Sequence, residues 1–244
     1  MSDIRTEVNL APLEPDVLDA LRQVSTATLA TQIYKLGFNS RVMRGVRRLG
    51  NTATMVGVAR TLRYVAARED IDTLPEWQRD ENPQRLIADI IEPGQVLVVE
   101  AREDQSCGTM GGMLVARMQA RGAAGIVSDA PYRDGEFIAG LSMPTFATGM
   151  NANTNLIAHH PEDLDMTITC AGVQVRPGDV IVGDGDGVIV IPRYLAADVA
   201  EPSLRQEREE AWIEKRIMAG APVSGTYPMS EATRAEFEAD ATDA

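Results

Sequence analysis

Arg133 and Asp134 stand next to each other in the segment "SDAPYRDG", directly after the hydrophobic run "GIV" at residues 125–127. A guanidinium can bind a carboxylate through two parallel hydrogen bonds, and an aspartate oxygen is a ligand that divalent cations prefer. An isolated Arg-Asp pair is more often a solvated turn that caps a helix. Here the pair follows a predicted strand, and in parallel sheets ligands gather at the carboxyl ends of the strands. The pattern therefore favours a site for an anion and a metal.

A second segment that could bind an anion is "GTMGGMLVARMQARG", in which Gly108, Gly111 and Gly112 precede a predicted helix. Glycine lets the backbone approach a ligand closely, and the free N–H groups of a helix's first turn attract anions. The spacing matches neither a Walker A loop nor a dinucleotide-binding fingerprint. A glycine-opened helix alone is more often structural. As a binding loop, it would suit a carboxylate better than a triphosphate.

The hydrophobic periodicity of the chain predicts the elements that position these two segments. Strand-like and helix-like runs alternate through the middle of the chain, which is typical of parallel α/β units. Both segments then open on the same edge of one sheet. The predicted helices are 13–25, 26–37, 82–90, 110–122, 133–140 and 193–220; the predicted strands are 52–65, 95–100, 125–129 and 143–148, followed by a β-meander over 166–172 and 178–192.

The ends of the chain are predicted to be helical extensions of one α/β domain. Pro202 is expected to break or restart the last helix, and residues 221–244 to form an arm that needs a partner surface. The predicted parts of the single domain 1–244 are a core at about 40–195, an N-terminal helical extension at 12–37, and a C-terminal helix and arm at 194–244.

The composition restricts the function classes. The net charge is −13 and the pI about 4.6, which argues against nucleic acid as a partner. Cys107 and Cys170 are too few for a disulfide framework. The segment "MSDIRTEVNL" lacks the basic and apolar regions of a secretory signal, and no apolar run approaches 18 residues, so we expect neither a secretory signal nor a transmembrane helix. We expect a cytoplasmic protein that acts on a small molecule.

Three further motifs have simpler interpretations. His159 and His160 are adjacent in an expected polar loop, and adjacent histidines rarely converge on one metal. The segment "GDGDG" at 183–187 lacks the spread of ligands and the terminal glutamate of a calcium loop, so a hairpin turn is favoured. Four glutamates, Glu207, Glu209, Glu210 and Glu214, predict a solvated helix face opposite a buried stripe of Trp212, Ile213 and Ile217.

Several segments in order resemble the regulator of ribonuclease activity A-like (RraA-like) family. They are "GGMLVARMQARGAAGIVSDAPYRD", "MPTFATG" and "RPGDVIVGDGDGVIVIP", and they cover most of residues 105–192. This family includes class II pyruvate aldolases that act on 4-hydroxy-4-methyl-2-oxoglutarate and 4-carboxy-4-hydroxy-2-oxoadipate. The resemblance implies an α/β/β sandwich like that of phosphohistidine swivelling domains.

The resemblance also implies an activity and roles for residues. The expected reaction is retro-aldol cleavage of a 2-keto acid, or decarboxylation of oxaloacetate, through a metal-stabilised pyruvate enolate. Arg133 is expected to bind the carboxylate of pyruvate, and Asp134 to hold Mg²⁺ or Mn²⁺ largely through waters. Glu209 or Glu210 is expected to reach the site of a neighbouring subunit in a homotrimer or a dimer of trimers. The backbone amides that complete the substrate cradle are expected to be those of Gly111, Gly112, Met113 and Leu114.

The chain departs from the family pattern in three places. Many of the aldolases have an acidic residue where this chain has Gly112, so Asp129 or Asp104 would have to replace it near the metal's waters. Pro131 and Tyr132 stand where small or aliphatic residues are usual, and are expected to reshape the pocket. The segment "MNANTN" at 150–155 predicts an amide-rich wall.

Two other functions remain open on the same residues. One is dehydration of a sugar acid at the same metal site, for which the asparagines and Tyr132 would be suited. The other is a non-enzymatic regulator that binds an RNA-processing endonuclease, as one branch of the family does.

Overall fold

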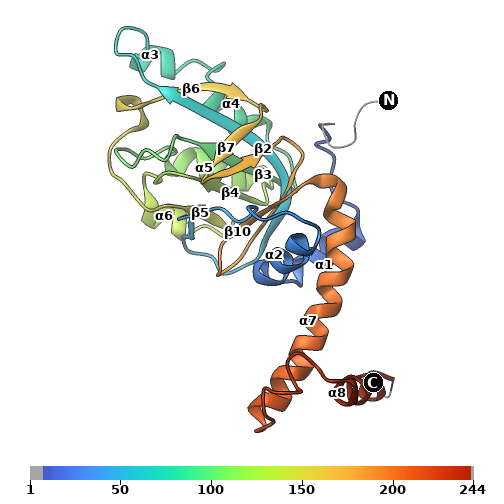
Figure 1. Cartoon of the computed structure of the whole chain (residues 1–244). Helices are drawn as coiled ribbons and strands as arrows, with labels where there is room; N and C mark the ends of the chain where they lie inside the picture. Colours follow the sequence, from blue (N-terminus) through green and yellow to red (C-terminus); the bar gives the residue numbers. More distant parts are fainter. Residues whose placement is uncertain (1–7, 243–244) are drawn as a thin grey trace.

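The computed structural model describes residues 8–242 and is built on one mixed sheet. Its strands lie in the order β1-β5-β4-β3-β2-β9-β10, with β6 also paired to β2 (Figure 1). β2, β3, β4 and β5 are parallel neighbours, whereas β1, β6, β9 and β10 join through antiparallel pairs. The strands are β1 (Arg47–Arg48), β2 (Met55–Ala66), β3 (Gln95–Glu100), β4 (Gly125–Ser128), β5 (Thr145–Ala147), β6 (His159–Leu164), β9 (Val180–Gly183) and β10 (Val188–Ile191).

Helices cover one face of the sheet and a small hairpin covers the other. The helices are α4 (Pro83–Ile90), α5 (Gly112–Ala120) and α6 (Gly135–Ala139), and they pack on Leu97 and Val99 of β3. The hairpin, β7 (Ile168–Cys170) with β8 (Val173–Val175), packs on Val96 and Val98. A strand buried on both faces needs a continuous hydrophobic run, as in "VLVV". The predicted α/β/β architecture is confirmed.

The terminal helices form a third packed group beside β9 and β10. They are α1 (Pro15–Arg22), α2 (Thr26–Lys35) and α7 (Ala196–Met218), which follows a 3₁₀ turn, η2 (Arg193–Leu195). Leu21, Leu29 and Val199 are fully buried in this group. The predicted turn at 183–187 connects β9 and β10, and Asp184 in it accepts hydrogen bonds from the N–H (2.7 Å) and hydroxyl (2.6 Å) of Thr26. Asp184 thereby adds a carboxylate at the first residue of α2, next to its N-cap Ser25.

Several details of the predicted secondary structure are wrong. The residues predicted as one β-meander belong to two sheets, because β7 pairs only with β8 while β9 and β10 complete the main sheet within the described residues. His159 and His160 open strand β6 instead of lying in a loop. Pro202 lies inside α7, which continues through it without a break. The helices α3 (Leu74–Trp77) and α8 (Glu231–Thr242) and the 3₁₀ turn η1 (Asn155–Ile157) were not predicted.

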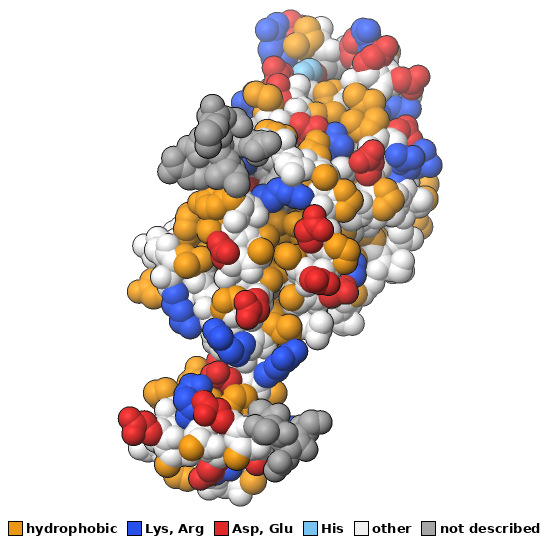
Figure 2. Space-filling model, turned by 90° about the vertical axis from the view of Figure 1, so that its right-hand side faces the viewer, with side chains coloured by type: hydrophobic (Ala, Val, Ile, Leu, Met, Phe, Trp, Pro, Cys, Tyr) orange, Lys and Arg blue, Asp and Glu red, His pale blue; other side chains and the backbone are white. Residues whose placement is uncertain are grey.

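The end of α7 projects from the body and is met there by α8. We call residues 209–242 the C-terminal lobe, which lies below the body in both views (Figures 1 and 2). The ring centroids of Trp212 and Phe237 are 5.5 Å apart, and the Trp212 indole donates a hydrogen bond to Asp240 at 2.9 Å. The C-terminal residues therefore find a partner surface within their own chain. Of the predicted stripe, Ile213 is buried, whereas Trp212 and Ile217 are half-buried.

Among residues 8–242, no helix combines the length and apolar character needed to cross a membrane.

Candidate active site

The two segments singled out by sequence meet at the carboxyl ends of the parallel strands. The loop before α5 and the loop after β4 run side by side: the N–H of Thr109 donates to the carbonyl of Pro131 (2.8 Å), and the N–H of Arg133 donates to that of Met110 (2.9 Å). Gly108 is required by this close approach, because a Cβ there would lie 2.5 Å from the backbone nitrogen of Arg133. The predicted juxtaposition is present.

Asp134 connects the two loops through its side chain. It has left-handed backbone angles (φ 61°, ψ 38°) at the start of α6, and its carboxylate does not cap that helix. Instead Oδ2 accepts a hydrogen bond from the N–H of Gly112 at 3.0 Å and lies 3.7 Å from Nε of Arg133. A negative charge at the first turn of α5 is favourable for the helix dipole. The interpretation that the Arg-Asp pair caps α6, the helix that follows it, is therefore wrong.

Arg133 and Asp134 open into a cavity of about 300 Å³. Both side chains are a little under half exposed, at 44% and 46%, so the cavity is accessible from solvent. The cradle residues Gly111, Met113 and Leu114 also line it. Gly112 does not line it: a Cβ at this position would lie 2.6 Å from Cδ1 of Phe137. The ring of Phe137 thus occupies the space that an acidic side chain at position 112 would need.

The far wall of the cavity comes from residues that sequence reasoning missed. Trp77 belongs to α3, Gln84 to α4, and Asn155 to η1. Gln84 is buried and joins them: its Oε1 accepts from Trp77 Nε1 (3.0 Å) and Asn155 Nδ2 (2.7 Å), and its Nε2 donates to the carbonyl of Thr109 (3.0 Å). A signal was present, since Gln84 shares the buried face of α4 with Ile87 and Ala88 at helical spacing. The complete lining is Leu74, Trp77, Gln84, Arg85, Gly108, Gly111, Met113, Leu114, Arg133, Asp134, Thr154, Asn155 and Leu156.

Two predicted features of the pocket lie elsewhere. Tyr132 is completely buried and donates its hydroxyl to the carbonyl of Phe146 at 3.0 Å, and neither it nor Pro131 lines the cavity. Alternation along an extended segment explains this, because Tyr132 and Arg133 point in opposite directions. The predicted amide wall is present in part: Asn155 lines the cavity, whereas Asn151 donates to the carbonyl of Gln105 (2.8 Å).

Asp129 and Asp104, the expected substitutes for an acidic residue at 112, do not line the cavity either. Asp129 is buried and accepts hydrogen bonds from the N–H groups of Ala101 (2.6 Å) and Glu103 (3.4 Å), so it holds the loop after β3. Burial raises its pKa to about 6 in spite of these donors. Asp104 accepts from the N–H of Ser106 at 2.9 Å.

The residues present fit a divalent cation that keeps most of its waters. Asp134 is the one carboxylate lining the cavity, and residues 8–242 contain no group of three or more His, Cys, Asp or Glu that could hold a metal ion. Mg²⁺ retains several waters and often uses one or two carboxylates. The hydrogen bond and the ion pair of Asp134 both use Oδ2, which leaves Oδ1 for such a ligand. A fully protein-ligated site of the zinc type does not fit.

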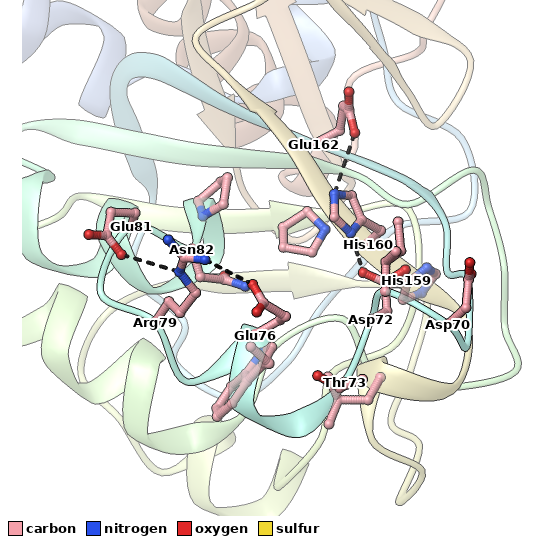
Figure 3. A pocket seen from close by; sticks show the side chains of 15 residues that line it. Asp70, Asp72, Thr73, Glu76, Arg79, Glu81, Asn82, His159, His160 and Glu162 are labelled. Atoms are coloured by element: carbon pink, nitrogen blue, oxygen red, sulfur yellow. Dashed lines mark hydrogen bonds and ion pairs between the residues drawn. The ribbon is translucent and has the colours of Figure 1, made fainter.

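A second, larger hollow of about 640 Å³ shares Trp77 of α3 with this cavity. Figure 3 shows the larger hollow from close by. His160 lies there between Asp72 and Glu162. His159 is buried against the Tyr64 ring and accepts a hydrogen bond from Arg102 at 3.1 Å; burial lowers its pKa to about 4, so it is neutral at pH 7. The two imidazoles thus have separate structural partners.

Glu209 is remote from the cavity of its own chain. It lies on α7 in a different hollow and forms an ion pair with Arg234 at 3.3 Å. The course of α7, which leads away from the sheet, agrees with this separation (Figure 1).

Fold and cavity together define an α/β/β protein with a cavity lined by Arg133 and Asp134 at the carboxyl ends of its parallel strands. The chain belongs to the RraA-like family: the family model, described as aldolase/RraA, matches residues 15–190.

Individual relatives agree with this membership. A Halalkalibacterium halodurans protein named "Putative 4-hydroxy-4-methyl-2-oxoglutarate aldolase" is 26% identical over 211 residues, covering 85% of this chain and 91% of that protein. The solved structure of Streptomyces coelicolor RraAS2, described as an unusual member of the RNase ES inhibitor RraA protein family, is 28% identical with a TM-score of 0.74, covering 84% and 98% of the two chains. An uncharacterized Pseudomonas syringae protein shares the fold at TM-score 0.80 and 22% identity, covering 94% and 100%.

Proposed function

We propose that this protein is a divalent-metal-dependent lyase that cleaves a C–C bond in a 2-keto acid. The observation that carries the proposal is the presence of Arg133, Asp134 and the first turn of α5 in one accessible cavity. The aldolase name of the relative that matches most of both chains supports the same class.

Side-chain and backbone groups of the cavity suit the C1 carboxylate and the keto oxygen of a 2-keto acid. Arg133 would bind the C1 carboxylate, and the N–H groups of Met113 and Leu114, which have no acceptor within α5, would donate to the keto oxygen. Asp134 would hold the cation, whose positive charge would stabilise an enolate. Cleavage breaks the C3–C4 bond: its electron pair becomes the enolate of pyruvate, the C4 hydroxyl proton leaves, and a carbonyl product departs. Oxaloacetate would lose CO₂ to give the same enolate, which takes up a proton.

We further propose Mg²⁺ or Mn²⁺ as the cation and a trimer-based assembly as the active form. Glu209 lies outside the cavity of its own chain, so it could contribute only to the cavity of another copy. A Glu209→Gln variant that assembles normally and loses activity would support this, with assembly measured by analytical ultracentrifugation. Unchanged turnover would remove Glu209 from the proposal.

The lyase itself is tested by pyruvate release from 4-hydroxy-2-oxo acids and from oxaloacetate. Arg133→Ala and Asp134→Ala should each reduce kcat/KM by a factor of about 100 or more, because each removes a charged contact to the reacting unit or its cation. EDTA should suppress wild-type turnover and added Mg²⁺ or Mn²⁺ should restore it. Full turnover in EDTA would contradict metal dependence.

A second candidate is a regulator that binds an RNA-processing endonuclease, favoured by the likeness to S. coelicolor RraAS2, a member of the RNase ES inhibitor RraA protein family. The cavity does not distinguish this function, since regulation would use the outer surface. Co-purification with the purified endonuclease at micromolar concentration would support the regulator. Pyruvate release without any complex would leave the lyase as the remaining candidate.

A further inference from the structure

We propose that Arg85 binds a second carboxylate of the substrate and so determines a preference for dicarboxylic 2-keto acids. The inference rests on the proposed lyase function and adds to it a residue of the opposite wall. Arg85 lies on α4 and lines the same cavity as Arg133, which comes from the loop after β4. The cavity is therefore bordered by two guanidinium groups on separate elements.

The polar contacts of Arg85 are incomplete. Its Nε is buried and has no hydrogen-bond partner among residues 8–242. Its ion pair is with Asp80 at 3.8 Å, and the Asp80 side chain is 98% exposed, so solvent weakens that interaction. A buried N–H without an acceptor is costly and normally has a ligand or water. The side chain as a whole is 35% exposed, so an anion in the cavity would bind the accessible terminal nitrogens of this incompletely paired guanidinium.

The guanidinium is also held in place before any ligand arrives. Its central carbon lies 5.5 Å from the centroid of the Trp77 ring, and the Trp77 indole is fixed by its hydrogen bond to Gln84 at 3.0 Å. Gln84 in turn bonds to the carbonyl of Thr109, in the loop that pairs with the Arg133 loop. A guanidinium held by a cation–π contact loses less conformational freedom when it binds a carboxylate.

Charge and size indicate the kind of ligand. Two arginines and one aspartate line the cavity, and the cation proposed at Asp134 adds positive charge. A substrate with a single carboxylate would leave Arg85 with only its solvent-weakened contact to Asp80. A cavity of about 300 Å³ is at the small end of ligand sites, which fits an acid of a few carbon atoms.

The test compares two substrates that differ only at the far end. 4-Hydroxy-2-oxoglutarate and 4-hydroxy-2-oxopentanoate both release pyruvate by the same bond cleavage, but only the first has a second carboxylate. In Arg85→Gln, kcat/KM for the dicarboxylate should fall about 10- to 100-fold, chiefly through KM, while the monocarboxylate value stays within about twofold. Arg85→Lys should recover part of the preference, since it keeps the charge and loses the planar fork.

Arg117→Gln is the matched control. Arg117 is an exposed arginine on α5 that pairs with Asp89 of α4 and does not line the cavity, so both substrates should be unaffected. Thermal unfolding of each variant shows that the fold is retained. An equal loss of kcat/KM on both substrates, or a preference for the dicarboxylate that persists in Arg85→Gln, would contradict the role of Arg85. Neither result would contradict the lyase function. Wild-type protein that releases pyruvate from neither these substrates nor oxaloacetate overturns the lyase and this inference with it.

Discussion

Phe137 gives a physical reason for the glycine at position 112. A Cβ on Gly112 would lie 2.6 Å from the Phe137 ring and 3.3 Å from Cβ of Asp134. Any side chain at position 112 would therefore require the Phe137 ring to move. Within residues 8–242 no other carboxylate lines this cavity, so Asp134 alone provides its negative charge.

Gly108 should be as important to the site as the charged residues. Gly108→Ala places a methyl group 2.5 Å from the backbone nitrogen of Arg133, so the loops must separate and displace Arg133 and Asp134. We expect a loss of about 1–3 kcal/mol in unfolding free energy and at least a tenfold loss in kcat/KM. The control is Gly185→Ala, at a position with no atom within 4 Å. Equal behaviour of the two variants in urea unfolding and pyruvate release would contradict the close-approach argument.

Asp129 should make stability depend on pH. Its folded pKa of about 6 lies above the value of about 3.9 for an unfolded chain, because the carboxyl is buried. A raised pKa means that the folded state binds the proton more tightly, so this contribution is present below about pH 4 and is lost as the pH rises through about 6.

Asp129→Asn tests this contribution, since the amide cannot ionise and still has an acceptor for the N–H of Ala101. Relative to wild type, its unfolding free energy should increase by about 2–3 kcal/mol between about pH 4 and pH 7. Urea unfolding at several pH values measures the difference. A difference that does not change with pH would refute the buried-carboxyl explanation.

At the scale of elements, α7 retains a proline that costs helix stability. Pro202 has no N–H, so the carbonyl of Asp198 loses its normal helical donor, yet the helix runs from Ala196 to Met218. Tertiary packing of Val199, Ala200 and Ser203, which are buried on both sides of the proline, explains why the helix does not break.

Pro202→Ala should therefore stabilise the protein. Proline in a helix interior is about 3 kcal/mol less favourable than alanine, because it lacks the N–H and its ring clashes with the preceding turn, so we expect a gain of up to about 3 kcal/mol. Glu201→Ala, at the neighbouring exposed position, restores no hydrogen bond and is the control. Thermal and urea unfolding compare the two, and a loss of stability in Pro202→Ala would show that the ring's packing outweighs the hydrogen bond.

At the scale of the whole molecule, the body and the C-terminal lobe are held by different contacts. Among residues 8–242, the three hydrophobic clusters of the body contain no residue beyond Leu204. The lobe relies on Trp212 with Phe237 and Asp240, and on ion pairs from Arg216 to Glu236 and from Arg234 to Glu209.

A chain that ends at Gly220 should consequently keep a folded body. We expect the thermal midpoint to change by no more than a few degrees, the far-ultraviolet circular dichroism to lose the signal of α8, and Trp212 fluorescence to shift to longer wavelength as its ring becomes exposed. A collapse of the main transition would show that the lobe supports the body.

Local patterns in the sequence determined much of this protein. The run "VLVV" after a turn was predicted as a buried strand, which is confirmed. Arg133, Asp134 and the glycines of 108–112 were singled out by residue type and by their positions after strands and before helices. These features depend on neighbours a few residues away, through backbone geometry and hydrophobic period.

Tertiary structure alone decided where side chains far apart in the sequence meet. It buried the Tyr132 side chain in the core and placed the Phe137 ring over Gly112. It brought Trp77, Gln84 and Asn155 together as the wall of the cavity opposite Arg133. It also carried α7 through Pro202 and folded α8 onto its end. Burial and long-range hydrogen bonds outweigh local propensity at these positions, and neither can be read from the spacing of residues along the chain.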